Sequence, residues 1–236
     1  MKDYYLRELA DNFEVVEIFK KIDSTNLYAL RTLEKSNRRL IIAQNQTNGQ
    51  GRWGKKFYSY DNCGLYFTLV LYNNNLFQQT MMKMAIAIVT TINNYYNKKL
   101  MIKWVNDIYE NDKKVGGILI QQKDNYLIIG VGLNLYQPAI GYDDEINNKA
   151  QALFDDKIAD KRLLVAIIKS FFQEMSSEKL LSLYKRHSLV LNKQIYHLQL
   201  NKKYYVKDFN KEGNLIVIDD NNKQTIISSG TIEMRV

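Results

Sequence analysis

Apolar residues recur along the first three-quarters of the chain with two different periods. A period of two, or an unbroken apolar run, is typical of strands, whereas a spacing of three or four residues is typical of amphipathic helices. Strand-like runs lie at 40–43, 65–71, 100–104, 108–109, 115–121 and 126–135. Helix-like spacings lie at 27–33, 78–96, 163–172 and 180–183. The two patterns together predict a sheet with helices packed on its faces.

A short polar segment, residues 110–113, separates two of the predicted strands. Such a segment between β-rich runs predicts a hairpin, which would place Asp107 and Lys114 near its two ends. A second turn at 124–125 extends the hairpin to a meander of three strands. In its last strand, Gly130 and Gly132 permit a close approach of another part of the chain.

Beyond Asn192 the chain changes character. Short β-rich runs follow one another, separated by turns rich in Asn, Asp, Lys and Gly, at 195–200, 204–206, 215–218 and 225–227. A segment of this length buries too little apolar surface to be very stable alone. We therefore expect two domains, a main domain at 1–190 and a small all-β domain at 191–236 that packs against it.

Composition narrows the class of protein. The chain has 236 residues, 46% hydrophobic and 25% charged, which is ordinary for a globular protein. Its one cysteine, Cys63, cannot form an internal disulfide, and residues 1–19 carry too many charges for the apolar core of a signal peptide. No apolar run approaches the length of a membrane span. We expect a cytoplasmic protein that is not integral to a membrane.

The net charge of +8, with 17 tyrosines, raises the alternative of a basic nucleic-acid-binding module without catalysis. The lysines are scattered along the chain, however, and no block of five or more like charges occurs. Charge therefore supports that alternative only weakly. Attraction to an acidic protein partner is the better expectation.

A glycine-rich loop contains the first candidate site. Gly49, Gly51 and Gly54 expose backbone N–H groups, while Arg52 supplies a planar cation, and this combination suits a phosphate or a carboxylate. The same residues are also compatible with a wide hairpin turn, and Trp53 either packs beside a ligand or fills the core. The loop lacks the Gly-Lys-Ser/Thr ending of the phosphate loop of ATPases.

A second candidate site follows on the predicted hairpin. Lys103 and Lys114 are either solvated strand-end lysines or cations of a binding site. Lys114 is followed by Gly116 and Gly117, whose lack of side chains would let a ligand approach the strand. These neighbours favour the second alternative for Lys114.

Several polar residues have two readings each. Asn106 and Asp107 form either a turn or a contact to a ribose or a magnesium ion. Asn134 either caps a strand or reaches into the same cleft. The segment Ser24, Thr25, Asn26 forms either a helix N-cap or a ligand contact.

Taken in order, four segments resemble the motif series of biotin–protein ligases. They are residues 24–26, 49–54, 103–107 and 114–119, and residues 230–233 look like the ending of that family's C-terminal domain. The resemblance implies an α+β fold: a mixed β-sheet flanked by helices, a class II synthetase-like catalytic core, followed by a small C-terminal SH3-like β-barrel. This agrees with the pattern of strands and helices.

The resemblance also implies an activity. ATP would activate biotin as biotinyl-5'-AMP, with Mg²⁺, and the biotinyl group would pass to a lysine of a biotin carboxyl carrier protein or domain. Catalysis would fall to Arg52, Lys114 and Asp107, with Asp107 as a metal ligand. The implied biotin-binding residues are Ser24, Thr25, Asn26, Gln46, Gly49, Gly51, Arg52, Trp53, Gly54, Lys114, Gly116 and Gly117. The implied nucleotide-binding residues are Arg52, Lys103, Trp104, Asn106, Asp107 and Asn134.

Three positions depart from the pattern that biotin–protein ligases commonly have. Gln50 stands where an arginine is frequent, Val105 where a proline is usual and Phe57 where a tryptophan is frequent. None removes a charge assigned to chemistry, although the first predicts looser retention of the adenylate.

Other expectations follow from the same resemblance. Lipoate–protein ligases, which share the catalytic core, remain an alternative. The few residues before Ser24 leave no room for a three-helix DNA-binding domain, so no specific DNA binding is expected. A homodimer is expected by analogy.

Overall fold

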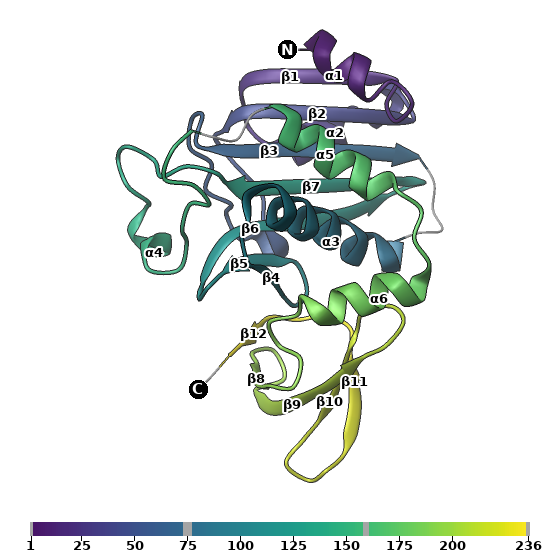
Figure 1. The fold of residues 1–236 in the computed structure, drawn as a ribbon, viewed down its shortest axis with the longest axis vertical. Coiled ribbons are helices and arrows are strands. Elements are labelled where there is room, and N and C mark those ends of the chain that lie inside the picture. The colour runs from purple at the N-terminus through teal and green to yellow at the C-terminus, as the bar shows by residue number, and fades with distance from the viewer. Residues whose placement is uncertain (1, 73–76, 158–160, 235–236) are drawn as a thin grey trace.

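The computed structural model describes residues 2–72, 77–157 and 161–234. Its strands form two sheets, and Figure 1 shows the larger sheet above the smaller one. The seven-stranded sheet has the order β1-β2-β3-β7-β6-β5-β4, and the five-stranded sheet has the order β11-β10-β9-β8-β12. Among the described strands of the large sheet, β1 and β2 pair in parallel and all other pairs are antiparallel, so the sheet is mixed, as the resemblance implies.

The strand bounds follow the apolar runs closely. The large sheet consists of β1 (Val15–Ile22), β2 (Arg38–Gln46), β3 (Gly64–Tyr72), β4 (Leu100–Lys103), β5 (Asp107–Glu110), β6 (Lys113–Lys123) and β7 (Tyr126–Asn134). The small sheet consists of β8 (Gln194–His197), β9 (Lys202–Phe209), β10 (Leu215–Ile218), β11 (Gln224–Ile227) and β12 (Ile232–Glu233). Strand β3 is buried on both faces through its centre, as its unbroken apolar run predicts.

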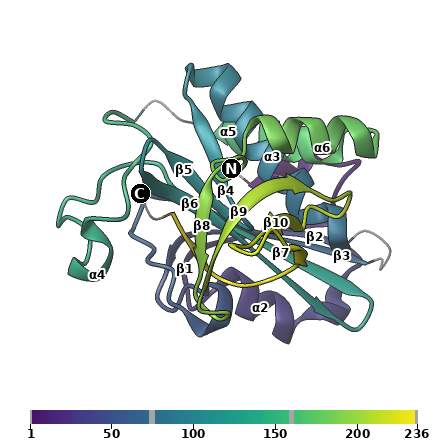
Figure 2. The ribbon, with the colours of Figure 1, turned by 90° about the horizontal axis from the view of Figure 1, so that it is seen from below.

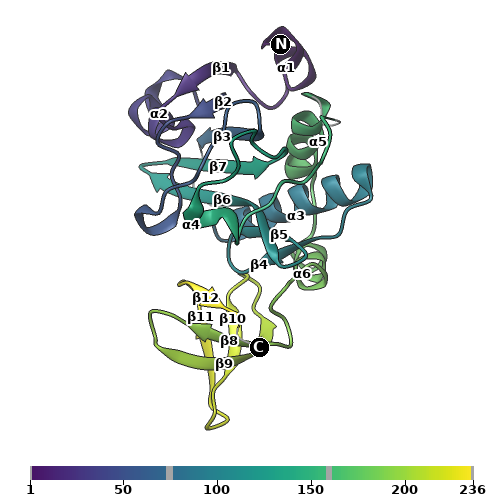
Figure 3. The ribbon, with the colours of Figure 1, turned by 90° about the vertical axis from the view of Figure 1, so that its left-hand side faces the viewer.

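Helices cover both faces of the large sheet (Figure 3). The helices are α1 (Lys2–Glu8), α2 (Thr25–Arg31), α3 (Phe77–Tyr96), α4 (Asp144–Asn147), α5 (Lys161–Phe172) and α6 (Ser177–Arg186). The main core lies between the sheet and α3, α5 and α6, and includes Met84, Ile88 and Leu164. A separate small cluster, which includes Ala29, Ile41 and Val70, lies under α2 on the other face.

The predicted hairpin of β5 and β6 forms and brings its two charged residues together. Asp107 pairs with Gly117 in the register, and Lys114 pairs with Tyr109 after a register shift. The side chains of Asp107 and Lys114 consequently meet on one face of the hairpin, with Lys114 Nζ 2.6 Å from Asp107 Oδ1. Along the hairpin, Asp107 begins β5 and Lys114 lies next to the turn, as predicted, and their side chains are nevertheless in contact.

The small sheet is antiparallel and packs beneath the large one, as the turn-rich C-terminal sequence predicts. Figure 2 shows it from below. Trp104 donates its Nε1–H to the carbonyl of Gly213 at 3.0 Å, and the ring of Tyr184 on α6 packs edge-on against Phe209. Among the strands described, β11 and β12 are the two edges and do not pair with each other. The sheet agrees with an SH3-like domain.

Some elements have no counterpart in the sequence prediction. They include α1, β1, α4 and β12. Within the described ranges, no helix is long and apolar enough to cross a membrane.

Candidate active site

A cleft lies where β2, β5, β6 and β7 meet the glycine loop and the segment before β12. It collects most of the residues that the sequence predicts for the site. Those that line it are Ser24, Thr25, Asn26, Gln46, Gly51, Arg52, Trp53, Lys103, Trp104, Asn106, Asp107, Lys114 and Gly117. Segments far apart in the sequence thus converge on one cavity.

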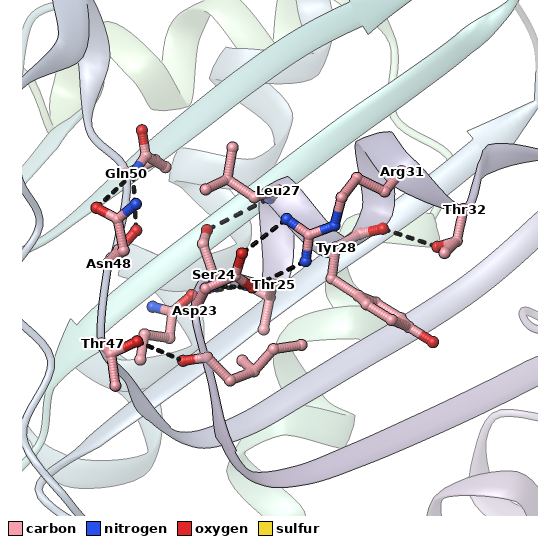
Figure 4. A network of polar contacts seen from close by, with 12 residues as sticks. Asp23, Ser24, Thr25, Leu27, Tyr28, Arg31, Thr32, Thr47, Asn48 and Gln50 are labelled. Carbon is pink, nitrogen blue, oxygen red and sulfur yellow. Dashed lines mark hydrogen bonds and ion pairs between the residues drawn. The ribbon is translucent and has the colours of Figure 1, made fainter.

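The start of α2 forms the uncharged polar end of the cleft. Ser24 caps the helix, its Oγ accepting from the backbone N–H of Leu27 at 3.4 Å (Figure 4). Gln46, the last residue of β2, accepts at its Oε1 from the backbone N–H of Thr25 at 2.8 Å and from the Thr25 hydroxyl at 3.1 Å. Residues 24–26 therefore begin the helix and are also placed to contact a ligand.

Asn26 is held from two sides. Its Oδ1 lies 2.6 Å from the hydroxyl of Thr68, and its Nδ2 donates to Gln121 Oε1 at 3.1 Å. A Cβ on Gly130 would come within 2.0 Å of the same Oδ1, so only glycine leaves room for this amide. The side chains at this end form a fixed array of donors and acceptors without formal charge, which suits a ligand that is polar and neutral there.

The glycine loop brings Arg52 over the cleft. Trp53 has φ 59°, and the loop turns through a short 3-10 segment, Arg52–Gly54. Arg52 Nη1 donates to Asn106 Oδ1 at 3.4 Å and to the carbonyl of Gly230 at 3.3 Å. Burial lowers the pKa of this guanidinium, and the carboxylate of Asp107 opposes the shift. Both hydrogen bonds are long and both acceptors are neutral, so the cation is well placed for an anionic ligand.

Lys114 lies across the same cleft in an ion pair with Asp107. Both side chains are about one-third exposed, at 34% and 27%. The nearest atoms to a Cβ on Gly117 would be Asp107 Oδ1, at 3.3 Å, and the end of the Lys114 side chain, at 3.4 Å. A side chain at this position would crowd the ion pair, so the glycine leaves the strand accessible beside the ammonium.

Lys103 is a third cation of the cleft. Burial lowers the pKa of its ammonium, the nearby Asp107 opposes that shift, and the positive charge of Lys114 adds to it. The ammonium lies 5.2 Å from the centre of the Tyr109 ring, whose hydroxyl has its pKa raised to about 12 by burial. A desolvated cation of this kind gains most from an anionic ligand.

Four predicted site residues do not line the cleft. The Gly49 carbonyl accepts from the N–H of Phe57 at 2.9 Å, and a Cβ on Gly49 would clash with the Phe57 carbonyl at 2.4 Å. A Cβ on Gly116 would lie 2.6 Å from the carbonyl of Gly132. Both glycines permit close backbone packing, and neither lines the cleft.

Gly54 and Asn134 are the other two predicted site residues outside the cleft lining. Gly54 adopts φ 71° in open surroundings, which fits a turn. Asn134 ends β7 and donates to the carbonyl of Gln151 at 3.4 Å. The structure therefore supports the strand-end reading of Asn134 and does not bring it to the cleft.

The structure also adds residues that the sequence prediction missed. Lys55 and Lys56 line the cleft, and so does the segment Gly230–Ile232. The two lysines continue the basic glycine loop, so their proximity to Arg52 was a usable signal. No such signal existed for the C-terminal segment, because Gly230 is 178 residues from Arg52 along the chain.

A metal ion would find one carboxylate in the cleft. Asp107 is the one acidic residue in its described lining, and one of its oxygens already contacts Lys114. Within residues 2–72, 77–157 and 161–234, no group of three or more His, Cys, Asp or Glu side chains is placed to hold a metal. Magnesium would therefore depend on the phosphates of a nucleotide and on water for most of its ligands.

Comparison with known proteins places this cleft in a family. Residues 18–134 match the biotin/lipoate A/B protein ligase family. The bifunctional ligase/repressor BirA of Bacillus subtilis is 33% identical over 122 residues, which span 48% of this chain and 38% of that protein. The biotin–protein ligase of Homo sapiens is 29% identical over 180 residues, which span 66% of this chain and 25% of that protein.

Solved structures agree on the fold. The biotin protein ligase from Aquifex aeolicus in complex with biotin and ATP superposes with a TM-score of 0.79 at 23% identity, covering 94% of this chain and 99% of that one. The ligase from Leishmania major in complex with biotinyl-5-AMP superposes with a TM-score of 0.63 at 22% identity, covering 92% and 99%. Over residues 18–134 the chain thus matches the biotin/lipoate A/B protein ligase family, and its fold is that of the solved biotin protein ligases.

Proposed function

We propose that the protein is an ATP-dependent biotin ligase, which forms biotinyl-5'-AMP and transfers the biotinyl group to a lysine of a biotin carboxyl carrier protein. The observation that carries this proposal is the convergence of Arg52 and Lys114 on one cleft whose other end is polar but uncharged. A cation pair suits the carboxylate and the phosphate, and the amide array at Thr25 and Gln46 suits a neutral ureido ring. The name of the human relative, a biotin–protein ligase, points to the same acid.

In the first step, a carboxylate oxygen of biotin attacks the α-phosphorus of ATP. An O–P bond forms, and pyrophosphate leaves with the electrons of the P–O bond that breaks. Negative charge accumulates on the phosphoryl oxygens, where preorganised cations stabilise it by several kcal/mol. Lys114, held by Asp107 at 2.6 Å, and Arg52 are the groups that would supply this stabilisation.

In the second step, the amine of the acceptor lysine attacks the acyl carbon. The C–O bond to the phosphate breaks and AMP leaves. The attacking amine must lose a proton, and Asp107 is the carboxylate of the described cleft lining that could receive it. Closure of the loop around Arg52 would keep water from the adenylate in the meantime.

The nucleotide would occupy the end of the cleft near Lys103. Asn106 is fixed there by its Nδ2–H, which donates to the carbonyl of Ile118 at 2.8 Å, so its Oδ1 faces Arg52. Lys103 and Lys55 add positive charge for the phosphates. Magnesium, when bound with the nucleotide, would supply further charge neutralisation, and Asp107 is the carboxylate of the described cleft lining that could help to hold it.

The test is release of pyrophosphate from ATP and magnesium with either biotin or lipoate. Biotin should support release, and lipoate should support at least tenfold less. A purified carrier domain should then become labelled on one lysine, with a Lys→Arg acceptor as the control. Release with lipoate alone would move the assignment to the lipoate ligases of the same family. Release with neither acid would contradict the proposal.

A further inference from the structure

Arg39 carries a charge in the interior of the molecule, at the second position of β2. Its side chain is 0% exposed, and burying a cation is costly unless it is fully paired. Arg39 Nε donates to Glu17 Oε2 at 3.2 Å, and Nη2 contacts the same oxygen. Nη2 also donates to the hydroxyl of Thr32 at 3.0 Å, and Nη1 donates to the Thr32 carbonyl.

The second oxygen of Glu17 extends this cluster to α2. Glu17 Oε1 accepts from the hydroxyl of Tyr28 at 2.7 Å, and the guanidinium of Arg39 lies 5.8 Å from the centre of the Tyr28 ring. Thr32 in turn donates to the carbonyl of Tyr28 at 2.7 Å (Figure 4). We name Glu17, Tyr28, Thr32 and Arg39 the α2 clamp. Two of its members come from β1 and β2, and the other two from α2 and its C-cap.

The clamp fixes one end of a helix whose other end enters the cleft. Helix α2 has seven residues, so its ends are roughly 10 Å apart. At the far end Thr25 is bound to Gln46, which lies on the same strand as Arg39. Strand β2 therefore holds α2 at both ends, by an ionic cluster at the C-cap and by an amide at the N-terminus.

Apolar packing alone gives α2 little support. The cluster beneath it is small and separate from the main core, with Ala29, Leu33, Ile41, Val70 and Ile128 as its buried members. Such a cluster tolerates small shifts of a short helix, whereas a multiply bonded guanidinium does not. Thr25 and Asn26 are also bonded directly to Thr68, so the clamp would act by fixing where α2 places their backbone relative to the strands.

We propose that Arg39 and Glu17 are positioning residues, which set the geometry of the uncharged end of the cleft and thereby the affinity for the acid. The proposal rests on the proposed function, in which this end binds biotin. Neither residue lines the cleft. Their influence is transmitted through α2 to Thr25 and Asn26.

The test separates positioning from simple stabilisation. Glu17→Gln keeps the shape and removes the charge. The KM for biotin should rise about tenfold or more, while kcat and the KM for ATP stay within about twofold, because the cations of the cleft are untouched. Arg39→Lys keeps the charge but loses the fork that reaches Thr32, so it should give a smaller rise. The Arg39→Lys variant also tests the proposal if Glu17→Gln does not fold.

Asp219→Asn is the matched control. Asp219 is likewise a mostly buried carboxylate, 6% exposed, paired with Lys202 at 2.7 Å, but it lies in the turn between β10 and β11 and does not line the cleft. This variant should lower the melting temperature without changing the KM for biotin. If Glu17→Gln behaves in the same way, the clamp only stabilises the fold and the proposal is overturned.

A second measurement does not depend on activity. Hydrogen exchange at the backbone N–H of Thr25, which is bound to Gln46, should become about tenfold faster in Glu17→Gln and stay unchanged in Asp219→Asn. Unchanged exchange at Thr25 would overturn the clamp. If wild-type protein does not activate biotin, the proposed function fails, and exchange at Thr25 still decides whether the clamp positions α2.

Discussion

At the scale of the residue, the ion pair of Lys114 with Asp107 is the feature that most directly links geometry to chemistry. Replacing Lys114 with Gln removes the ammonium but keeps much of the side chain. Pyrophosphate release should fall about 10²- to 10³-fold, as for other lost groups that stabilise developing charge. Lys114→Arg keeps the charge but not the 2.6 Å contact and should retain more activity. Equal activity in Lys114→Gln and wild type would show that this lysine is not catalytic.

Trp53 offers an optical signal of loop closure. Its indole is 66% exposed, whereas Trp104, the other tryptophan of the chain, is 4% exposed. If the glycine loop closes over the adenylate, acrylamide should quench the fluorescence less in the presence of biotin and ATP than without them. Trp53→Phe should remove the difference, because Trp104 is shielded in both states. Quenching that ligands leave unchanged would argue against closure.

Lys103 predicts a dependence on pH. Burial lowers its folded-state pKa below the ordinary value of 10.5, so the ammonium is lost at a lower pH than in an exposed lysine. The charged form binds phosphates, so the KM for ATP should rise as the pH increases through that lowered pKa. The sign for stability is opposite: the free energy of unfolding should increase as the pH rises from the lowered pKa towards 10.5.

The matched variant for this pH profile is Lys103→Gln. It should have a higher KM for ATP near neutral pH and should lose this part of the pH dependence. If the variant and wild type show the same rise with pH, the titrating group is another residue.

At the scale of the element, the fit of α2 against β7 depends on one missing side chain. Gly130→Ala would place a methyl group 2.0 Å from Asn26 Oδ1 and should cost about 1–3 kcal/mol of unfolding free energy. Gly117→Ala is the comparison, since its nearest atoms, at 3.3 and 3.4 Å, are the ends of flexible side chains. Urea denaturation of both should show the larger loss in Gly130→Ala. A loss in Gly117→Ala as large as in Gly130→Ala would contradict this account.

Most elements were predictable because their apolar residues follow one period over enough positions. The long helix α3 and the central strand β3 are the plainest cases. Strand β1 was missed because its sequence, Val15–Ile22, mixes Glu and Lys with apolar residues. Such a pattern is usual for an edge strand, which has only one neighbour, here β2, and needs less apolar surface.

The candidate site was predictable in its charged part and less so in its packing. Arg52 and Lys114 were candidates because each is a cation close to glycines, and the resemblance to biotin–protein ligases supplied their expected role. The sequence could not separate Gly117, which opens the cleft, from Gly116, which packs against Gly132. That difference depends on which face of β6 each residue occupies, and therefore on the strand register.

At the scale of the whole molecule, the small sheet completes the cleft. The carbonyl of Gly230 accepts from Arg52, and the segment up to Ile232 lines the cavity. The proposed domain boundary at 190/191 lies between α6, which ends at Arg186, and β8, which begins at Gln194. The small domain would then contribute to binding as well as to stability.

The contact of Trp104 with Gly213 tests how the two sheets depend on each other. Trp104→Phe removes the Nε1–H donor and leaves the Gly213 carbonyl without it, which should cost about 1–3 kcal/mol. Loss of this contact between the sheets should make hydrogen exchange faster in the small sheet. The KM for ATP should rise as well, because Trp104 also lines the cleft. The control is Tyr196→Phe, which removes an exposed hydroxyl contact to Asn201 within the small domain. It should change neither the hydrogen exchange of the small sheet nor the KM for ATP. Faster exchange with an unchanged KM would mean that the small sheet can loosen without disturbing the cleft.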